Sequence, residues 1–500
     1  MTTTIGKTDN PLRVAIIGAG PSGFYAADAL LKQTAYHVEI DMFDRLPTPF
    51  GLVRGGVAPD HQKIKSVTKI YEKIAAHPSF RLYGNVEFGR ALKHDEFRQH
   101  YHQIIYAVGA QTDRKLGIPG ETLAGSYAAT QFVAWYNSHP DFRYLDFDLS
   151  KQVVAVVGNG NVAMDVARIL ASTYDELHRT DIADYALEAL SHSNITDIYL
   201  LGRRGPAQAA FTNPELKELG EMEDADVIIL PEEVALDPIS QADMIAHPDP
   251  MVTKNMATLA DFASRQPQGK RRRIHLRFLV SPLEIGGETH VENIKLVKNG
   301  LRLGSDGSVR AQATDQLETL PIDLVFRSIG YVGVALPGVP FNAAAGVIPN
   351  KDGRVFDPET DLTVPGEYAV GWIKRGANGI IGTNKPDSQA TVNSMLADVP
   401  TLLPLDPHDA TRESVEALLS ARQPDFTTFD DWLVLDQHEI SRGQEVNRPR
   451  VKFSDVDQML KVLKEARTQD GPNQPVIPVT PAVVPTIVPV SVPNTMQATD

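Results

Sequence analysis

The stretch VAIIGAGPSG, residues 14–23, decides the fold. An apolar run that fits a buried strand leads directly into the spacing G-x-G-x-x-G, which begins at Gly18. The helical spacing of apolar residues predicts a helix over 24–33, and residues 37–43 fit the next strand. A strand, a glycine turn, a helix and a second strand in this order are typical of a Rossmann unit that binds a dinucleotide.

A second unit of the same kind follows further along the chain. Residues 153–163, VVAVVGNGNVA, repeat the strand and the glycine loop. We expect a long helical region over 165–190, then a strand over 195–201, and a less regular stretch over 246–273. The apolar segment 323–331 fits a strand that returns the chain to the first unit.

The first loop and its surroundings favour FAD. Gly18 permits the tight turn, Gly20 lets a pyrophosphate approach the backbone, and Gly23 lets the helix pack on the strand. Asp44 closes the second strand, where a carboxylate accepts hydrogen bonds from the adenosine ribose. The glycine-rich segment 371–382 is expected to approach the flavin ring, and a plain surface loop is its alternative.

The second loop favours NADP over NAD. An NAD site has an acidic residue at the end of its second strand, whereas here Arg203 and Arg204 follow that strand. Two guanidinium groups match the charge and the geometry of a 2′-phosphate. The alternative is a solvated pair of arginines, but the pair follows a glycine loop that ends in Ala163, a residue that the motif allows.

Two units, one inserted into the other, predict the α/β class with two interleaved Rossmann-like domains of the glutathione-reductase type. We expect an FAD-binding domain from residues 1–112 and 330–467, and an NADP-binding domain from residues 113–329. Residues 468–500 are expected to form a disordered Pro- and Val-rich tail, because closely spaced prolines exclude a helix.

The amino-acid composition limits the possible acceptors of electrons that two bound dinucleotides would transfer. The 500 residues contain no cysteine, so the chain holds neither a redox disulfide nor a Cys-ligated iron–sulfur cluster, and we expect no metal site. Electrons that enter must therefore leave to a substrate or to another protein. The net charge of -15 disfavours nucleic acid as a partner. Neither a membrane span nor a targeting segment is predicted, so we expect a cytoplasmic protein.

With these motifs in place, the chain resembles adrenodoxin reductase and its bacterial ferredoxin–NADP reductase relatives. The resemblance runs from Leu12 to about Leu463. It is carried by the segments 49–54 (PFGLVR), 56–61 (GVAPDH), 158–168, 202–206 (GRRGP), 328–331 (SIGY) and 371–376 (GWIKRG). It implies a bacterial, monomeric flavoenzyme that transfers electrons between NADPH and a small ferredoxin-type iron–sulfur protein through FAD.

The resemblance also implies site residues. The positions where the family contacts FAD are Ser22, Asp44, Leu52, Phe88, Trp372, Gly379, Ile380 and Ile381. The positions where it contacts NADP are Asn159, Gly160, Asn161, Val162, Arg203, Arg204 and Glu215. The candidates for catalysis near the hydride-transfer site are His61, Glu215 and Asp165. The basic run KRRR, residues 270–273, is a candidate for the face that meets the partner protein.

Some of these roles have plainer alternatives. A loop histidine beside an acid, such as His61 after Asp60, is often only structural, because hydride transfer to a flavin is the cofactor's own chemistry. Asp165 has the alternative of stabilising the N-terminus of its helix.

Three rival functions are considered. A flavin disulfide reductase needs a cysteine pair and is excluded. A flavin-dependent NADPH oxidase or monooxygenase is disfavoured, because the motif F-x-G-x-x-x-H is missing. A non-catalytic sensor that binds NADPH and FAD is disfavoured by the intact Arg203, Arg204 and 371–376 segment. Bleaching of the yellow protein by NADPH without oxygen would separate a reductase from a sensor.

Overall fold

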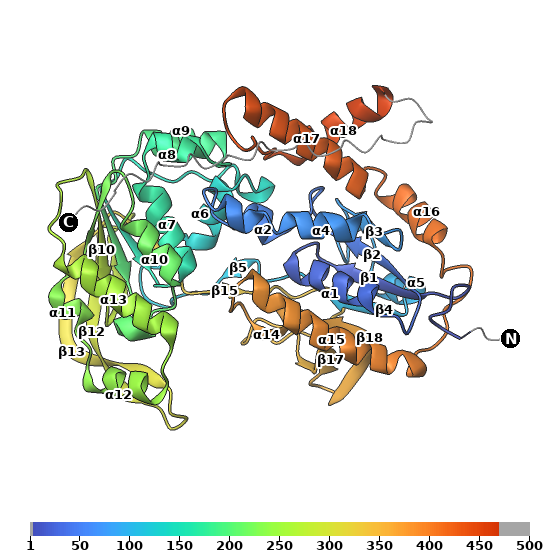
Figure 1. The fold of residues 1–500 in the computed structure, drawn as a ribbon, viewed down its shortest axis with the longest axis horizontal. Coiled ribbons are helices and arrows are strands. Elements are labelled where there is room, and N and C mark those ends of the chain that lie inside the picture. The colour runs from blue at the N-terminus through green and yellow to red at the C-terminus, as the bar shows by residue number, and fades with distance from the viewer. Residues whose placement is uncertain (1–3, 470–500) are drawn as a thin grey trace, which may run out of the picture.

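The computed structural model describes residues 4–469, which form two lobes side by side (Figure 1). The lobe on the right of Figure 1 contains the first and the last parts of the chain, and the lobe on the left contains the middle part. Each lobe is built around a mostly parallel sheet. None of the helices within residues 4–469 is long and apolar enough to cross a membrane.

The first lobe holds a seven-stranded sheet. Its order is β16 (Asn350–Lys351), β17 (Arg354–Asp357), β18 (Leu362–Ala369), β4 (Gln103–Tyr106), β1 (Leu12–Ile17), β2 (Val38–Phe43) and β3 (Phe80–Tyr83). The pairs from β18 to β3 are parallel, and β16 and β17 add an antiparallel edge.

Strand β1 is buried on both faces, as its continuous apolar sequence predicts. Val14 and Ile16 point into one core, while Ala15 and Ile17 point into the other. The first core is closed by α1 (Pro21–Lys32), α4 (Thr68–Ala75), α15 (Asn384–Asp398), α17 (Phe429–Glu445) and α18 (Val456–Gln469). The second core is closed by α5 (His94–His100) and α16 (Arg412–Arg422).

The second lobe holds a six-stranded parallel sheet. Its order is β6 (Ser126–Ala128), β14 (Leu324–Arg327), β7 (Val153–Val157), β8 (Asp197–Leu201), β10 (Arg272–Arg277) and β9 (Ala225–Ile228). One face is covered by α6 (Ala129–Tyr136), α7 (Asn161–Ala171), α9 (Asp184–Ser191), α10 (Asn213–Leu219) and α13 (Pro250–Ser264). The other face packs on an antiparallel sheet of β11 (Val280–Gly286), β12 (Asn293–Leu303) and β13 (Val309–Pro321).

The chain crosses between the lobes twice, and the two crossings lie together. Strand β5 (Thr112–Asp113) leaves the first lobe, and β15 (Tyr331–Val332) returns to it as its antiparallel partner. The second sheet is therefore inserted between strands of the first. This arrangement confirms the predicted class of two interleaved Rossmann-like units.

The structure differs from the sequence prediction in two segments. The region 165–190 is not one long helix, because the chain breaks after α7 and continues as α8 (Tyr174–His178) and α9. Thr173 starts α8 by accepting the Glu176 N–H, while the Glu176 carboxylate accepts the Thr173 N–H. The stretch 246–273, expected to be irregular, contains the regular helix α13, which is capped by Asp249.

Shorter elements complete the description. The remaining α-helices are α2 (Leu52–Gly55), α3 (Gln62–Lys65), α11 (Pro231–Val234), α12 (Pro238–Ala246) and α14 (Trp372–Arg375), and the 3₁₀ turns are Pro140–Phe142, Pro206–Gln208, Ile381–Thr383 and Val399–Thr401. Helix α18 continues through Gln469, two residues into the predicted tail, and the rest of that prediction, from position 470 onward, lies outside the described residues.

Candidate functional site

The first glycine loop joins β1 to α1 at the carboxyl edge of the first sheet. Gly18 has a φ of +109°, and a Cβ there would lie 2.6 Å from the carbonyl oxygen of Ala107. The close approach of two strands therefore requires glycine at this position. Two hydrogen bonds hold Ala19 within the loop: the Phe50 N–H donates to the Ala19 carbonyl at 2.7 Å, and the Ala19 N–H donates to Asp44 at 2.8 Å.

Asp44 orients the loop from the end of β2. One carboxylate oxygen accepts the Ala19 N–H, and the other accepts the Leu46 N–H at 3.0 Å. Burial raises the pKa of Asp44, although both backbone N–H groups and Arg45 oppose this shift. A further donor such as a ribose hydroxyl would stabilise the charged form. Its predicted contact with the adenosine ribose stays a prediction.

The C-terminal glycine segment meets the first loop. A Cβ on Gly371 would lie 2.6 Å from the Ser22 side chain, so the two segments are in direct contact. Trp372 follows, and its indole N–H donates to the Asn378 carbonyl at 3.1 Å. The Trp372 ring lies 5.4 Å from the Tyr331 ring, where the chain returns to the first lobe. The structure thus brings the segment that contains Trp372 against Ser22, and the contacts of both residues with a flavin stay a prediction.

The other residues expected around FAD lie in different parts of the first lobe and differ in their exposure. Leu52 begins α2 next to Gly51, which approaches the first loop at Gly20. Phe88 is 8% exposed and stacks on Phe97 in the core of the first lobe. Gly379, Ile380 and Ile381 form the turn before α15, and Ile380 is 62% exposed.

The second glycine loop repeats the geometry of the first. Gly158 has a φ of +135°, and a Cβ there would lie 2.2 Å from the Ser328 carbonyl oxygen. The Asn159 carbonyl accepts the Ala210 N–H at 3.2 Å, and the Asn161 side chain accepts the Thr212 N–H at 2.8 Å. Asn159 and Asn161 therefore fix the segment that leads into α10.

Both loops leave open helix N-termini. Gly20 and Gly160 are the N-cap residues of α1 and α7, and neither helix has a side-chain cap. Space is free where a Cβ of Gly20 would stand, with no atom within 4 Å. Val162 lies in the first turn of α7. Unpaired N–H groups and the helix dipole favour an anion at each position, so both loops fit a pyrophosphate.

Two arginines stand without ionic partners at the carboxyl end of β8. Within residues 4–469, neither Arg203 nor Arg204 makes a side-chain hydrogen bond or ion pair. Burial and the neighbouring Arg203 lower the pKa of Arg204. The side-chain nitrogen of Asn159, beside Gly202, is also buried without a partner. A phosphate group would satisfy these donors, so the residues fit a coenzyme with a 2′-phosphate.

Five charged or titratable side chains meet where the two lobes face each other. His61 precedes α3 in the first lobe, and its Nε2 lies 2.9 Å from Oε2 of Glu218 on α10. His61 Nδ1 lies 4.0 Å from Asp165 on α7. Arg168 bonds Asp60, Asp165 and Glu218. We call His61, Asp60, Asp165, Arg168 and Glu218 the junction cluster.

The junction cluster has shifted proton affinities. Burial lowers the pKa of His61, but the hydrogen bond to Glu218 and the charges of Asp165 and Asp60 outweigh it, so this pKa is raised overall. Burial raises the pKa of Asp165 to about 6, against the opposing charge of Arg168. His61 and Asp165, whose pKa values are both raised, form a candidate site for proton handling at the junction of the lobes.

Glu215 and Glu218 lie on the same helix, and only Glu218 contacts His61. Glu215, predicted beside the hydride-transfer site, accepts the Thr212 hydroxyl at the start of α10. Glu218, one turn later, lies against His61 instead. Sequence reasoning also missed Arg168 and Asp60. The one signal in the sequence was an acid and an arginine three residues apart on the helix behind the second loop.

The side chains of the basic run 270–273 mostly have partners within the chain. Arg272 is 4% exposed, and Arg273 pairs with Asp197 at 2.5 Å. Lys270 and Arg271 donate to backbone carbonyls at 2.6 and 2.7 Å. The run begins β10 at the amino edge of its sheet, whereas the glycine loops lie at the carboxyl edges. Most of these charges have partners within the chain, although Arg271 is exposed and the Arg273 side chain is 43% exposed, and the role of the run as a docking face stays a prediction.

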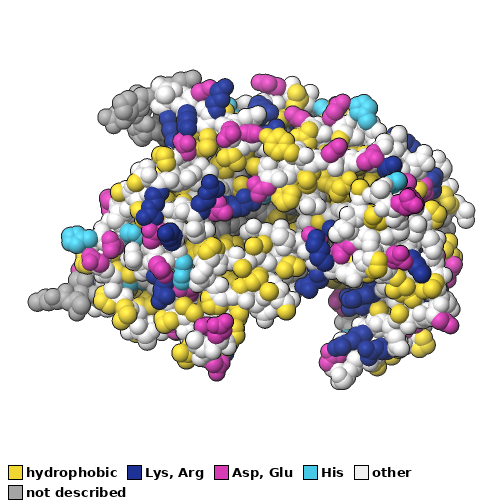
Figure 2. Space-filling model, turned by 180° about the vertical axis from the view of Figure 1, so that it is seen from behind, with side chains coloured by type: hydrophobic (Ala, Val, Ile, Leu, Met, Phe, Trp, Pro, Cys, Tyr) yellow, Lys and Arg dark blue, Asp and Glu magenta, His cyan; other side chains and the backbone are white. Residues whose placement is uncertain are grey.

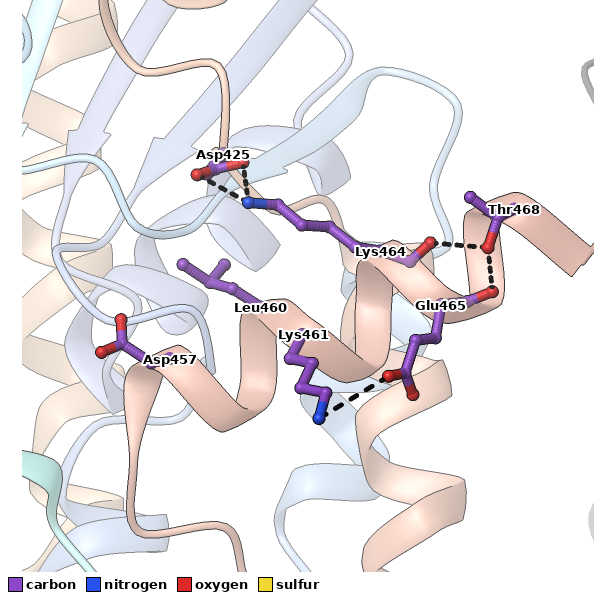
Figure 3. A pocket seen from close by; sticks show the side chains of 7 residues that line it. All are labelled: Asp425, Asp457, Leu460, Lys461, Lys464, Glu465 and Thr468. Carbon is purple, nitrogen blue, oxygen red and sulfur yellow. Dashed lines mark hydrogen bonds and ion pairs between the residues drawn. The ribbon is translucent and has the colours of Figure 1, made fainter.

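The surface is hollowed between the lobes. Figure 2 shows this hollow from behind, with Lys and Arg side chains on both of its rims. A separate cavity of about 470 Å³ lies on the outer side of α18 (Figure 3). It is lined by Asp425, Asp457, Leu460, Lys461, Lys464, Glu465 and Thr468. None of these residues belongs to a glycine loop or to the junction cluster, so we do not assign this cavity to a coenzyme.

One sheet inserted into another, with a glycine loop suited to an anion in each lobe, defines an oxidoreductase fold that binds two dinucleotides. The family model described as pyridine nucleotide-disulphide oxidoreductase matches residues 12–200. The chain is 46% identical over 464 residues to the NADPH-ferredoxin reductase FprA of Mycobacterium tuberculosis, covering 90% of this chain and 99% of that protein. It is 38% identical over 456 residues to the mitochondrial NADPH:adrenodoxin oxidoreductase of Arabidopsis thaliana, covering 89% of this chain and 94% of that protein.

The solved structures agree with the sequence relatives. The structure of Mycobacterium tuberculosis FprA in complex with NADPH superposes with a TM-score of 0.85 at 45% identity, covering 91% of this chain and 100% of that chain. The chain therefore belongs to the family of NADPH–ferredoxin and adrenodoxin reductases, as the motifs predict.

Proposed function

We propose that this chain is an NADPH–ferredoxin reductase that binds FAD at the first glycine loop and NADPH at the second. The observation that carries this proposal is the pair of loops at a shared junction, the second with two unpaired arginines. FAD, when bound, accepts two electrons as a hydride and gives them up one at a time. The relatives named as NADPH-ferredoxin reductases support the same reaction.

The residues of this chain would do the work of binding and orientation. The open N-termini of α1 and α7 would hold the two pyrophosphates. Arg203 and Arg204 would hold the 2′-phosphate, which selects NADPH over NADH. His61 and Glu218 would hold or move a proton at the junction of the lobes, where the nicotinamide has to meet the flavin.

The electron acceptor would be an external one-electron centre. The chain has no cysteine, so it offers no disulfide to reduce and no cluster of its own. The names of the relatives, ferredoxin and adrenodoxin reductases, support a small iron–sulfur protein as the partner.

The domain bounds follow the sheets. We assign FAD binding to residues 1–112 and 330–467, because the strands of the first sheet fall within these ranges. NADP binding is assigned to residues 113–329, which contain the second sheet. A monomeric state and a cytoplasmic location stay predictions, and light scattering behind a sizing column would check the first.

The test is reduction of cytochrome c by NADPH, with and without a candidate ferredoxin. The proposal expects the rate to depend on ferredoxin and to saturate with it. An equal rate without ferredoxin would show that the flavin passes electrons to any acceptor and would contradict a ferredoxin partner.

A further inference from the structure

Arg168 is the centre of the junction cluster. Its side chain is 5% exposed, and its three nitrogens all bond carboxylates. Nε and Nη2 donate to the two oxygens of Asp60 at 2.7 and 3.0 Å. Nη2 also donates to Asp165 at 2.9 Å, and Nη1 donates to Glu218 at 3.0 Å. The guanidinium is planar and all three of its nitrogens donate hydrogen bonds, so it holds the three carboxylates in fixed relative positions.

These partners come from both lobes. Asp60 lies in the first lobe, immediately before His61, while Arg168 and Glu218 lie on α7 and α10 of the second. The two-pronged bond to Asp60 therefore fixes the position of the His61 loop relative to α10. Oε2 of Glu218 accepts from Arg168 and also contacts His61, so one oxygen joins the two interactions.

The charges of the cluster make Arg168 hard to replace. Three carboxylates, Asp60, Asp165 and Glu218, share one buried guanidinium and one imidazole. Without the guanidinium the carboxylates would repel one another, and Glu218 would be free to turn away from His61.

We propose that Arg168 is a positioning residue for hydride transfer, which holds Glu218 against His61 across the two lobes. The inference rests on the proposed function, because it assigns the junction cluster to that reaction. Arg168 would touch neither coenzyme directly and would act through the pair that it holds.

The groups that face His61 decide the expected pH effect. They are Glu218 from α10, Asp165 and Arg168 from α7, and Asp60 from its own loop; Tyr136 of α6 and Tyr331 face Asp165. Arg168 is the one cation among them and lowers the pKa of His61. Loss of its charge alone would raise that pKa, but release of Glu218 removes the larger, raising contribution, so the proposal expects the His61 pKa to fall.

The experiment compares Arg168→Gln and Arg168→Lys holoenzymes with the wild type. Anaerobic stopped-flow mixing with NADPH measures the rate of flavin bleaching from pH 6 to 9. A histidine-selective NMR titration of the oxidised protein measures the pKa of His61, assigned with His61→Gln. We expect Arg168→Gln to keep FAD, to bleach about tenfold more slowly or worse, and to have a lower His61 pKa because the hydrogen bond to Glu218 is lost. Arg168→Lys, which keeps the charge, should restore the His61 pKa and part of the rate.

Arg448→Gln is the matched control. Arg448 is also buried and also joins the lobes, through the Thr180 and Ile182 carbonyls and Asp184, but it contacts no member of the junction cluster. We expect it to lower stability without moving the titration of His61.

The outcomes separate this inference from the proposed function. An unchanged rate and an unchanged His61 pKa in Arg168→Gln would overturn the inference while wild-type bleaching stands. An equal decrease in the bleaching rate of Arg168→Gln and Arg448→Gln, with an unchanged His61 pKa in both, would also overturn the inference. It would show that Arg168 only holds the two lobes together. Wild-type protein that NADPH does not bleach would overturn the proposed function itself.

A second variant tests the inference if Arg168→Gln does not fold. Asp60→Asn loosens the grip of Arg168 and removes a negative charge beside His61. It should slow bleaching while lowering the pKa of His61, and an unchanged rate would overturn the inference.

Discussion

Replacing both Arg203 and Arg204 by alanine should turn the protein from an NADPH enzyme into one that barely distinguishes NADPH from NADH. The two guanidinium groups lie side by side at the end of β8, without a hydrogen-bond or ion-pair partner among residues 4–469. Two positive charges so close repel each other unless an anion binds between them. The binding free energy of the 2′-phosphate is therefore more favourable here than at arginines that already have carboxylate partners.

The size of the effect follows from the bonds that would be lost. A hydrogen bond to a charged group contributes about 1.5–3 kcal/mol. Arg203 is exposed, so its share lies near the lower end, while the half-buried Arg204 contributes more. Together they should contribute about 3–4 kcal/mol, which is roughly a 10²- to 10³-fold loss in kcat/KM for NADPH. NADH lacks the phosphate, so its kcat/KM should stay within about threefold.

Ferricyanide reduction measures both coenzymes without a protein partner. The control is Arg271→Ala, which removes an arginine from the opposite edge of the same sheet and should leave the NADPH preference unchanged. An equal loss for NADPH and NADH in the double variant would refute the assignment of Arg203 and Arg204 to the phosphate.

Three further predictions follow from the fold. Acid precipitation should release a flavin that chromatographs as FAD, and recovery of FMN would contradict the first-loop site. Removal of residues 471–500 should leave FAD content and ferricyanide reduction unchanged, because α18, whose Met459 and Leu463 pack in the core, is kept. Loss of bound FAD would contradict this prediction. Asp181→Asn should lower the free energy of unfolding in urea by about 3–5 kcal/mol, because it leaves the buried Lys65 and Lys452 without their carboxylate partner. These two lysines hold the pKa of Asp181 far below its usual range despite burial. A change under about 1 kcal/mol would be inconsistent with this pairing.

The elements that the sequence predicts well are the ones with local causes. Each glycine loop follows an apolar run, and the steric need for glycine at Gly18 and Gly158 comes from neighbouring strands that every such unit possesses. The break before α8 was also readable, since Thr173 and Glu176 form the spacing of a capping box. The start of α13 carries Asp249 followed by Pro250, which is a strong helix-start signal.

The junction cluster could not be predicted in the same way. Asp60 and Arg168 are 108 positions apart, and His61 and Glu218 are 157 apart. Their meeting depends on how two lobes pack, and no local pattern encodes that. Glu215 and Glu218 lie on the same short helix, so only the packing of α10 decides which one reaches His61. The structure places Glu218 against His61, and the role predicted for Glu215 stays a prediction.

The most direct test of the central claim is anaerobic stopped-flow mixing in two steps. NADPH should first bleach the bound flavin, and oxidised ferredoxin should then restore its colour, consuming about two equivalents because each centre takes one electron. Bleaching that only oxygen reverses would indicate an oxidase or a monooxygenase. A yellow protein that NADPH does not bleach at all would contradict the account and leave a sensor as the better description.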